Sequence, residues 1–168
     1  MVITTVRGTF GDVDGTLEID DASPTTARGE IRVQTASIST GFGARDTHLR
    51  SADFFDVEQY PEIVVRFDGV EARGGDYRVT ADVTIRDVTR PVTFDVEHVG
   101  ETKNFQGTRH IAFTVKTTLD REAWGLNWNM ALEAGGWLVG KEIKLVVEVV
   151  ADEVVPATDA ERELAGAA

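Results

Sequence analysis

Apolar and polar positions alternate with a period of two over most of the chain. Between Tyr77 and Asp87, apolar side chains occupy every second position, and threonine or charged side chains occupy the positions between them. This pattern is typical of a β-strand with one face in water. Six further segments alternate in the same way, so the predicted strands are 13–19, 31–35, 63–67, 77–87, 92–96, 111–115 and 143–149.

Short connections rich in glycine, proline and aspartate separate most of these segments, and they predict hairpins and an antiparallel, largely up-and-down sheet. Strands of this kind form either a two-sheet sandwich or a closed barrel, and the pattern alone does not choose between them. A barrel of about eight strands is filled by side chains or holds one small ligand. The moderate bulk of the inward-facing valines and isoleucines favours a cavity.

Two connections are too long for hairpins, and the first is residues 38–61, which contains the stretch RDTHLRSADFFDVEQYP. Its segment 45–51 has fair helix propensity, and Asp46 and Arg50 stand four residues apart, so they can pair on one helix face. Residues 56–59 resemble a capping box and predict a second short helical turn. Long loops on a compact sheet usually carry the function.

The apolar side chains of this loop are too large to lie in open water, so they must cover one end of the strands. They either cap a core or form a lid over an apolar ligand. Catalysis by the charged side chains is the third alternative, but no nucleophile stands at a suitable spacing from a base. The charged side chains are expected to hydrogen-bond loop carbonyls instead. The apolar set is Leu49, Phe54, Phe55 and Tyr60, and the loop-structuring set is Arg45, Asp46, His48 and Arg50.

The second long connection, residues 120–137, again alternates large apolar side chains with small or polar ones. This pattern predicts an irregular strand or flap. Trp124 and Trp128 are candidate ligand contacts, although packing in the core is the more common use of tryptophan. Gly135 and Gly136 supply a turn before the last strand.

The amino-acid composition argues against several classes of function. A chain of 168 residues with 42% hydrophobic residues suits one domain. Its net charge of -12 argues against binding to nucleic acid or to anionic headgroups. The absence of cysteine excludes thiolate catalysis and cysteine-ligated metals, and three scattered histidines offer little to a metal. We therefore expect no metal and no cofactor.

The two ends of the chain complete this reading. No signal sequence or membrane span is recognisable, so the chain as given is expected to be cytoplasmic. The acidic, alanine-rich segment 152–168 is expected to be a tail, frayed or forming one short helix, that follows a domain of residues 1–151.

Several motifs together resemble the YceI-like family of bacterial proteins. They are RDTHLRSADFFDVEQYP, the following strand IVVRF, the stretch VTIRDVTRPVTFDVE and the final ALEAGGWLVGKEIKLVVEV. The resemblance runs from about Val6 to about Val150, and the first motif is its most specific part.

This resemblance implies a lipocalin-like antiparallel barrel of eight strands, with an elongated apolar pore that binds a polyisoprenoid, an isoprenoid quinone or a similar long lipid. It implies no enzymatic activity and no metal. Its entrance would be formed by the apolar set of the first loop. Its wall, assigned from strand alternation, would be formed by Ile63, Val65, Phe67, Val79, Val83, Ile111, Phe113, Val115 and Leu145.

The sequence departs from the family pattern at its beginning. The family normally opens with a Trp-containing segment and a first strand that carries a His-Ser pair, whereas this sequence begins with MVITTVRG. Seven strands leave an eight-stranded barrel with a slot of unpaired backbone groups. The slot is explained by a start site placed too late or a truncation, by a partner chain in a homodimer or strand exchange, or by the tail folding back. The first explanation is favoured, and it would leave an upstream export signal open.

We therefore expect a protein that binds, sequesters or carries a long amphiphilic lipid without chemistry. One alternative is a hydrolase or isomerase that uses His48 with Asp46 or Asp53 at the barrel mouth. Another is a filled barrel that acts as an interaction module.

Overall fold

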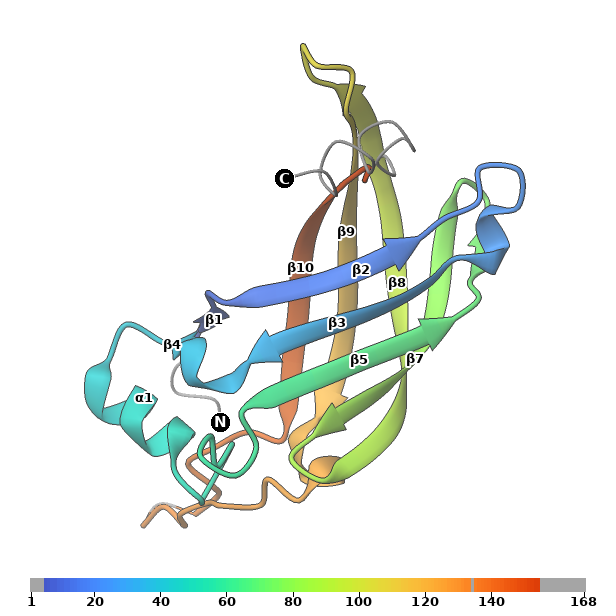
Figure 1. Cartoon of the computed structure of the whole chain (residues 1–168). Coiled ribbons are helices and arrows are strands. Elements are labelled where there is room, and N and C mark those ends of the chain that lie inside the picture. Colours follow the sequence, from blue (N-terminus) through green and yellow to red (C-terminus); the bar gives the residue numbers. More distant parts are fainter. Residues whose placement is uncertain (1–4, 134, 155–168) are drawn as a thin grey trace.

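A computed structural model describes residues 5–133 and 135–154 (Figure 1). Seven strands form one curled antiparallel sheet in the order β10-β9-β8-β7-β5-β3-β2. All seven predicted strands are confirmed, and several are longer than predicted. Their bounds are β2 (Val13–Glu18), β3 (Arg28–Gln34), β5 (Glu62–Asp68), β7 (Asp76–Ile85), β8 (Val88–Lys103), β9 (Arg109–Asp120) and β10 (Glu142–Asp152).

The structure also contains several short strands and helices. Strand β1 (Thr9–Phe10) pairs with β4 (Ile38–Ser39), and β6 (Glu71–Arg73) pairs with β7. The helix α1 (Gly43–Arg50) confirms the predicted helix of the first long loop. Single 3₁₀ turns lie at η1 (Pro24–Thr26), η2 (Thr35–Ser37) and η3 (Arg121–Trp124). In the described part of the chain, no helix is long and apolar enough to span a membrane.

The register of the sheet places the apolar positions of neighbouring strands side by side. Val65 of β5 stands opposite Ile31 on one side and Val83 on the other. Val115 of β9 likewise stands between Val96 and Val147. Since side chains alternate between the two faces of a strand, most positions on the concave face of the curled sheet are apolar.

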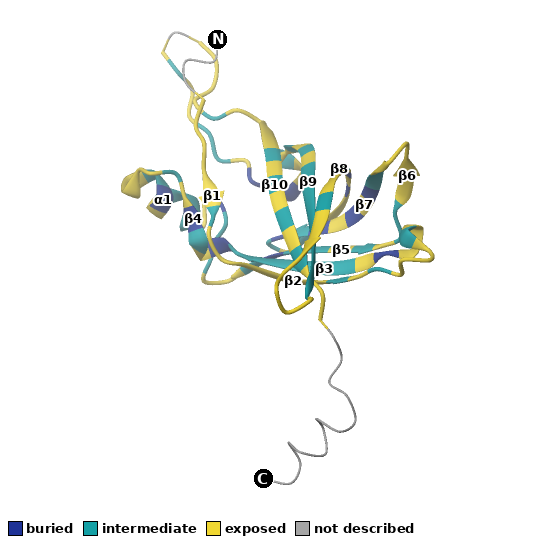
Figure 2. Cartoon of the chain, turned by 90° about the horizontal axis from the view of Figure 1, so that it is seen from above, coloured by how far each residue is buried: buried dark blue, intermediate teal, exposed yellow. Residues whose placement is uncertain are grey.

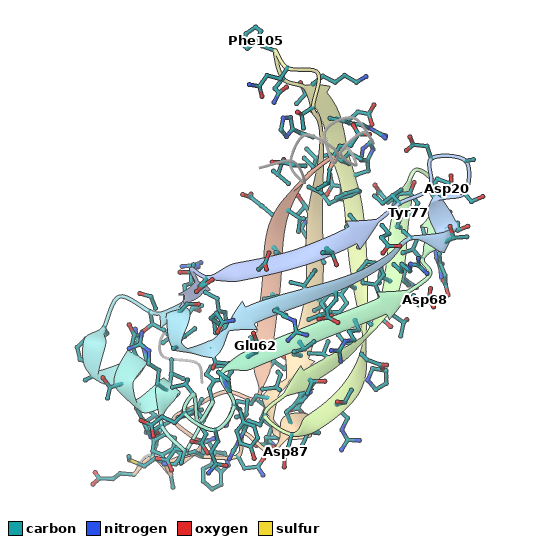
Figure 3. The ribbon with its side chains drawn as sticks, viewed as in Figure 1. Asp20, Glu62, Asp68, Tyr77, Asp87 and Phe105 are labelled. Carbon is teal, nitrogen blue, oxygen red and sulfur yellow. The ribbon has the colours of Figure 1, made fainter. Side chains whose placement is uncertain are left out.

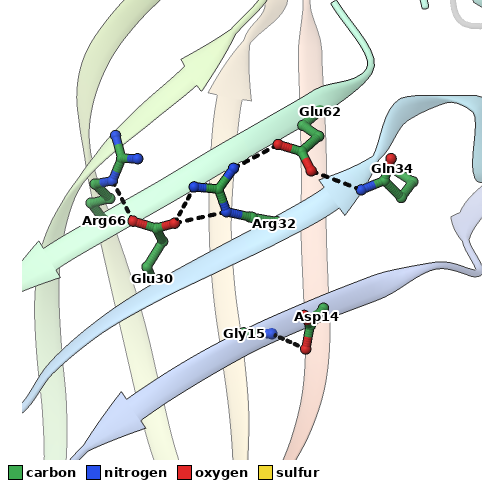
Figure 4. Close-up of polar contacts among 7 residues, drawn as sticks. All are labelled: Asp14, Gly15, Glu30, Arg32, Gln34, Glu62 and Arg66. Atoms are coloured by element: carbon green, nitrogen blue, oxygen red, sulfur yellow. Dashed lines mark hydrogen bonds and ion pairs between the residues drawn. The ribbon is translucent and has the colours of Figure 1, made fainter.

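The convex face carries charged side chains that pair across strands (Figure 4). The guanidinium of Arg32 donates to Glu30 at 2.7 Å and to Glu62 at 2.7 Å, and Arg66 donates to the other oxygen of Glu30 at 2.6 Å. The side-chain amide of Gln34 completes the row by donating to Glu62 at 3.0 Å. This face is therefore a solvated surface.

The hydrophobic core lies at one end of the concave face, near η3 at the bottom of Figure 1. Figure 2 shows fully buried residues concentrated on β7, whereas β2 and β10 are intermediate or exposed. The indole Nε1 of Trp124 donates to the carbonyl of Val83 at 3.0 Å and ties η3 to β7. The cluster consists of Ile63, Val79, Ala81, Val83, Ile85, Val92, Phe94, Trp124 and Leu126.

The sheet curls like a barrel, but the described strands do not close it. Within residues 5–133 and 135–154, β2 pairs only with β3 and β10 pairs only with β9. The slot predicted from the strand count therefore lies between these two edge strands. What fills the slot stays a prediction.

Candidate functional site

The loop between β4 and β5 is fixed by the charged residues that the sequence singled out. Asp46 is buried, and its carboxylate accepts hydrogen bonds from the backbone N–H and the hydroxyl of Thr40. These bonds, of which the hydroxyl bond is the strongest contribution, hold the pKa of the Asp46 carboxyl below its usual value. Arg45 donates to the hydroxyl of Thr40 at 2.8 Å and to its carbonyl at 3.1 Å.

Arg50 lies on the same helix, but the predicted pairing of its side chain with Asp46 is wrong. Its Nε and Nη2 donate to the carbonyls of Ala36 at 2.8 Å and Ile38 at 2.7 Å. The reason is local, since Asp46 is already satisfied by Thr40 while the two carbonyls need donors. Arg45 and Arg50 thus hydrogen-bond loop carbonyls, as the sequence predicted.

His48 occupies the junction between the two long loops. Its Nε2 lies 2.8 Å from the carboxylate of Asp53. Its ring makes edge-to-face contacts with Phe54 at 5.1 Å and with Trp128 at 4.4 Å between centroids. Among the described residues, no hydroxyl is hydrogen-bonded to this imidazole, and Asp46 faces Thr40 instead. The structure therefore brings together the His48–Asp53 pair of the catalytic alternative, but it does not bring Asp46 to His48.

The apolar side chains of the first loop close the end of the sheet that contains the core. Phe54 is buried and its ring lies 5.5 Å from that of Trp128. Phe55 is half-buried and packs edge-on against Phe10 at 5.6 Å, and Leu49 is also half-buried. These contacts are those of a cap over the core. A contact of these side chains with a ligand stays a proposal.

A single helical turn follows the two phenylalanines, as predicted. The amides of Gln59 and Tyr60 both donate to the carbonyl of Asp56, at 3.0 and 2.8 Å. The expected capping box is not the device that starts it, because Asp56 adopts a φ of 49° and its carboxylate faces Arg86 at 3.9 Å. The same guanidinium lies over the ring of Tyr60, 5.5 Å from its centroid.

Arg121 orders the second long loop, and sequence reasoning missed it. Its side chain is 5% exposed, and its guanidinium donates to the carbonyls of Gly140 at 2.8 Å, Trp128 at 3.1 Å, Val139 at 3.4 Å and Leu126. It has no ion-pair partner among the described residues. In the sequence it resembles any other charged residue that ends a strand, so no pattern distinguished it.

The expected flap is a short hairpin beyond this anchor. The side-chain amide of Asn129 donates to the carbonyl of Val139 at 2.8 Å and accepts from its N–H at 2.9 Å. Ala131 and Trp137 form a bridge. The three tryptophans of the loop differ in burial. Trp124 is buried, Trp128 is half-buried and Trp137 is exposed.

The nine residues predicted to line a pore do lie along the concave face, but the interior has two unlike halves. Ile63, Val79 and Val83 belong to the buried core. Four others are half-buried and pack against it, namely Val65, Phe67, Val115 and Leu145. Ile111 and Phe113 are also half-buried, but they lie outside the described core and its neighbours.

This second half lies toward the upper end of β9 in Figure 1, away from the capped end. Val147 of β10 and Ile31 of β3 resemble Ile111 and Phe113, since both are half-buried apolar residues outside the core contacts. We call the concave surface formed by Ile31, Ile111, Phe113, Val147 and Val149 the open trough. Five apolar side chains that are only half-buried form a surface suited to binding an apolar ligand.

Two depressions of the molecular surface lie elsewhere. They hold about 380 Å³ and 330 Å³, and charged side chains of the convex face dominate their lining. The first is lined by residues including Glu18, Glu30 and Arg66, and the second by residues including Arg78 and Lys116. Neither includes a residue of the open trough.

Known proteins share this fold and much of this sequence. A family model described as the YceI-like domain matches residues 1–151. A UPF0312 protein of Staphylococcus aureus (strain bovine RF122 / ET3-1) is 34% identical over 145 residues, which cover 86% of this chain and 82% of the relative. A UPF0312 protein of strain USA300 matches at the same identity and coverage.

Solved structures of other proteins have the same fold as this chain. The YceI protein of Campylobacter jejuni superposes with a TM-score of 0.79 at 25% identity, covering 92% of this chain and 89% of that one. BcnA of Burkholderia cenocepacia has the same fold, with a TM-score of 0.68 at 20% identity and 86% of each chain covered. The lipocalin-like architecture predicted from the sequence is confirmed, and the chain belongs to the YceI-like family.

Proposed function

We propose that this protein binds one long amphiphilic lipid, a polyisoprenoid or an isoprenoid quinone, and sequesters or carries it without chemical change. The observation that carries the proposal is the open trough, whose apolar side chains are half-buried and lie outside the packed core of the concave face. Family membership supports a lipocalin-like binding protein. Each methylene group of a ligand buried there would contribute about 0.8 kcal/mol.

The shape of the interior also supports a chain-like ligand. The core and the loop cap fill one end of the concave face, so a ligand would extend from the core along β9 and β10 toward the other end. The ordering of a flexible chain opposes binding. A ligand long enough to cover the trough from Val147 to Ile111 offsets this cost best.

A catalytic function is not favoured by the geometry. His48 has Asp53 as its carboxylate partner, and its ring packs between Phe54 and Trp128. This arrangement suits a residue that joins the two loops. His48→Ala is therefore expected to loosen the loops and lower stability, whereas an enzyme would lose turnover.

The test compares two substitutions on adjacent positions of β9. Phe113→Asp places a charge in the trough, and Thr114→Asp places the same charge on the convex face. Binding of geranylgeraniol is followed by native mass spectrometry. We expect Phe113→Asp to lose binding and Thr114→Asp to retain it.

Folding is checked for each variant by circular dichroism and urea unfolding. Val147→Thr, which replaces one methyl group with a hydroxyl at almost constant volume, serves as a milder trough variant and is expected to weaken binding. Equal binding by Phe113→Asp and Thr114→Asp, both folded, would show that the trough is not the ligand site.

A further inference from the structure

The open end of the trough carries a charged group on its inner side. Arg109 lies two residues before Ile111 on β9, so both side chains leave the strand on the same face. Its Nη1 donates to both carboxylate oxygens of Asp21, at 2.8 and 2.9 Å. Its Nη2 and Nε donate to Glu101 of β8, at 2.7 and 3.0 Å. We call these three residues the rim.

The rim spans the opening from one wall to the other. Asp21 belongs to the loop between β2 and β3, whereas Arg109 and Glu101 belong to the β8–β9 hairpin. Figure 3 labels Asp20, the neighbour of Asp21 in that loop, and Phe105 at the tip of the hairpin. The polar end of a ligand whose chain lay in the trough would therefore meet these side chains.

The charges of the rim do not favour an anion. Two carboxylates surround one guanidinium, and each of its three nitrogens already donates to a carboxylate oxygen. Asp21, followed by Glu101, raises the pKa of Arg109, so its positive charge persists at every physiological pH. The net charge of the rim is then about -1. Lys103, opposite Arg109 on β8, and Glu153, whose N–H donates to the carbonyl of Arg109, add one charge of each sign beside the rim. The whole chain carries a net charge of -12.

A phosphate at this position would face two carboxylates and would have to displace one of them from Arg109. A hydroxyl or a quinone carbonyl has no such conflict, because a hydroxyl can donate to a carboxylate and a carbonyl carries no charge. Repulsion between like charges is one way in which a binding site rejects the wrong ligand.

We propose that the rim formed by Asp21, Glu101 and Arg109 selects amphiphiles with an uncharged polar head over the same chains bearing a phosphate. The inference rests on the proposed function, since it concerns the head of the ligand whose chain fills the trough. It assigns a ligand class, prenyl alcohols and quinones, and it gives the two carboxylates a role in discrimination.

The test measures the affinity of geranylgeraniol and of geranylgeranyl phosphate for the same protein at low ionic strength. The wild type is expected to bind the alcohol at least about tenfold more tightly. In the double variant Asp21→Asn/Glu101→Gln, Arg109 becomes available to the phosphate, and the preference is expected to shrink by about tenfold. High salt should also reduce the preference of the wild type.

A matched control removes two carboxylates of the convex face, Glu97→Gln/Glu148→Gln, and should leave the preference unchanged. Equal affinity of the wild type for the two ligands, or a preference that the rim variant does not alter, would refute the role of the rim while leaving lipid binding intact. Binding of neither ligand would instead refute the proposed function, and the rim proposal would fail with it.

Discussion

Replacing Arg121 with methionine should destabilise the protein strongly, although the residue makes no ion pair among the described residues. The guanidinium donates to four carbonyls, and methionine fills part of the same space without a donor. A hydrogen bond from a charged donor contributes about 1.5–3 kcal/mol, but removing a buried charge also relieves its desolvation cost. We expect a net loss of about 3 kcal/mol in the free energy of unfolding.

The assay is urea unfolding followed by tryptophan fluorescence, with hydrogen exchange to locate the loosened backbone. Protection should fall most at residues 126–133 and 135–140, because the carbonyls of Leu126 and Trp128 lose their donor. Arg78→Met is the matched control, since Arg78 is a surface residue paired with Asp95 at 3.2 Å and should change stability by less than about 1 kcal/mol. A loss below about 0.5 kcal/mol in Arg121→Met would contradict the role assigned to this anchor.

Three further predictions concern stability. The depressed pKa of Asp46 means that its carboxylate stabilises the fold above its ordinary pKa of about 4 and that this contribution is lost as pH falls through the lowered value. Asp46→Asn should therefore flatten the dependence of the urea midpoint on pH between about 5 and 2. Trp124→Phe should lower the free energy of unfolding by about 2 kcal/mol, because it removes the hydrogen bond to Val83 and leaves a cavity. Trp137→Phe, at an exposed site, should leave the free energy of unfolding almost unchanged, and calorimetry measures both variants. Glu30→Gln should change stability by less than about 1 kcal/mol in 0.5 M salt, because its arginine partners are solvated.

The strands were predictable because burial of one face imposes a period of two on the sequence. That constraint acts on each strand separately, so it does not say how far along a strand the core extends. Val83 and Phe113 obey the same alternation, yet one is 2% exposed and the other is only half-buried. Their difference depends on which loops cover which end of the curled sheet, and this is a tertiary property.

The contacts of single side chains in the loops show the same limit of prediction from sequence. The identity of Asp46, Arg50 and His48 as loop-structuring residues was predictable from their polarity in a covered segment. Their partners were not, because spacing along the helix suggested Asp46 with Arg50 whereas the backbone carbonyls and Thr40 compete for both. Arg121 was missed altogether, because a buried arginine that donates only to carbonyls leaves no mark in the sequence.

The central claim is that the open trough holds one amphiphilic lipid, and native mass spectrometry of protein purified from a bacterial host tests it most directly. We predict a species heavier than the bare chain by the mass of one isoprenoid alcohol or quinone, which disappears in Phe113→Asp and persists in Thr114→Asp. Protein of the bare mass alone, after gentle purification and after incubation with a bacterial lipid extract, would contradict the claim.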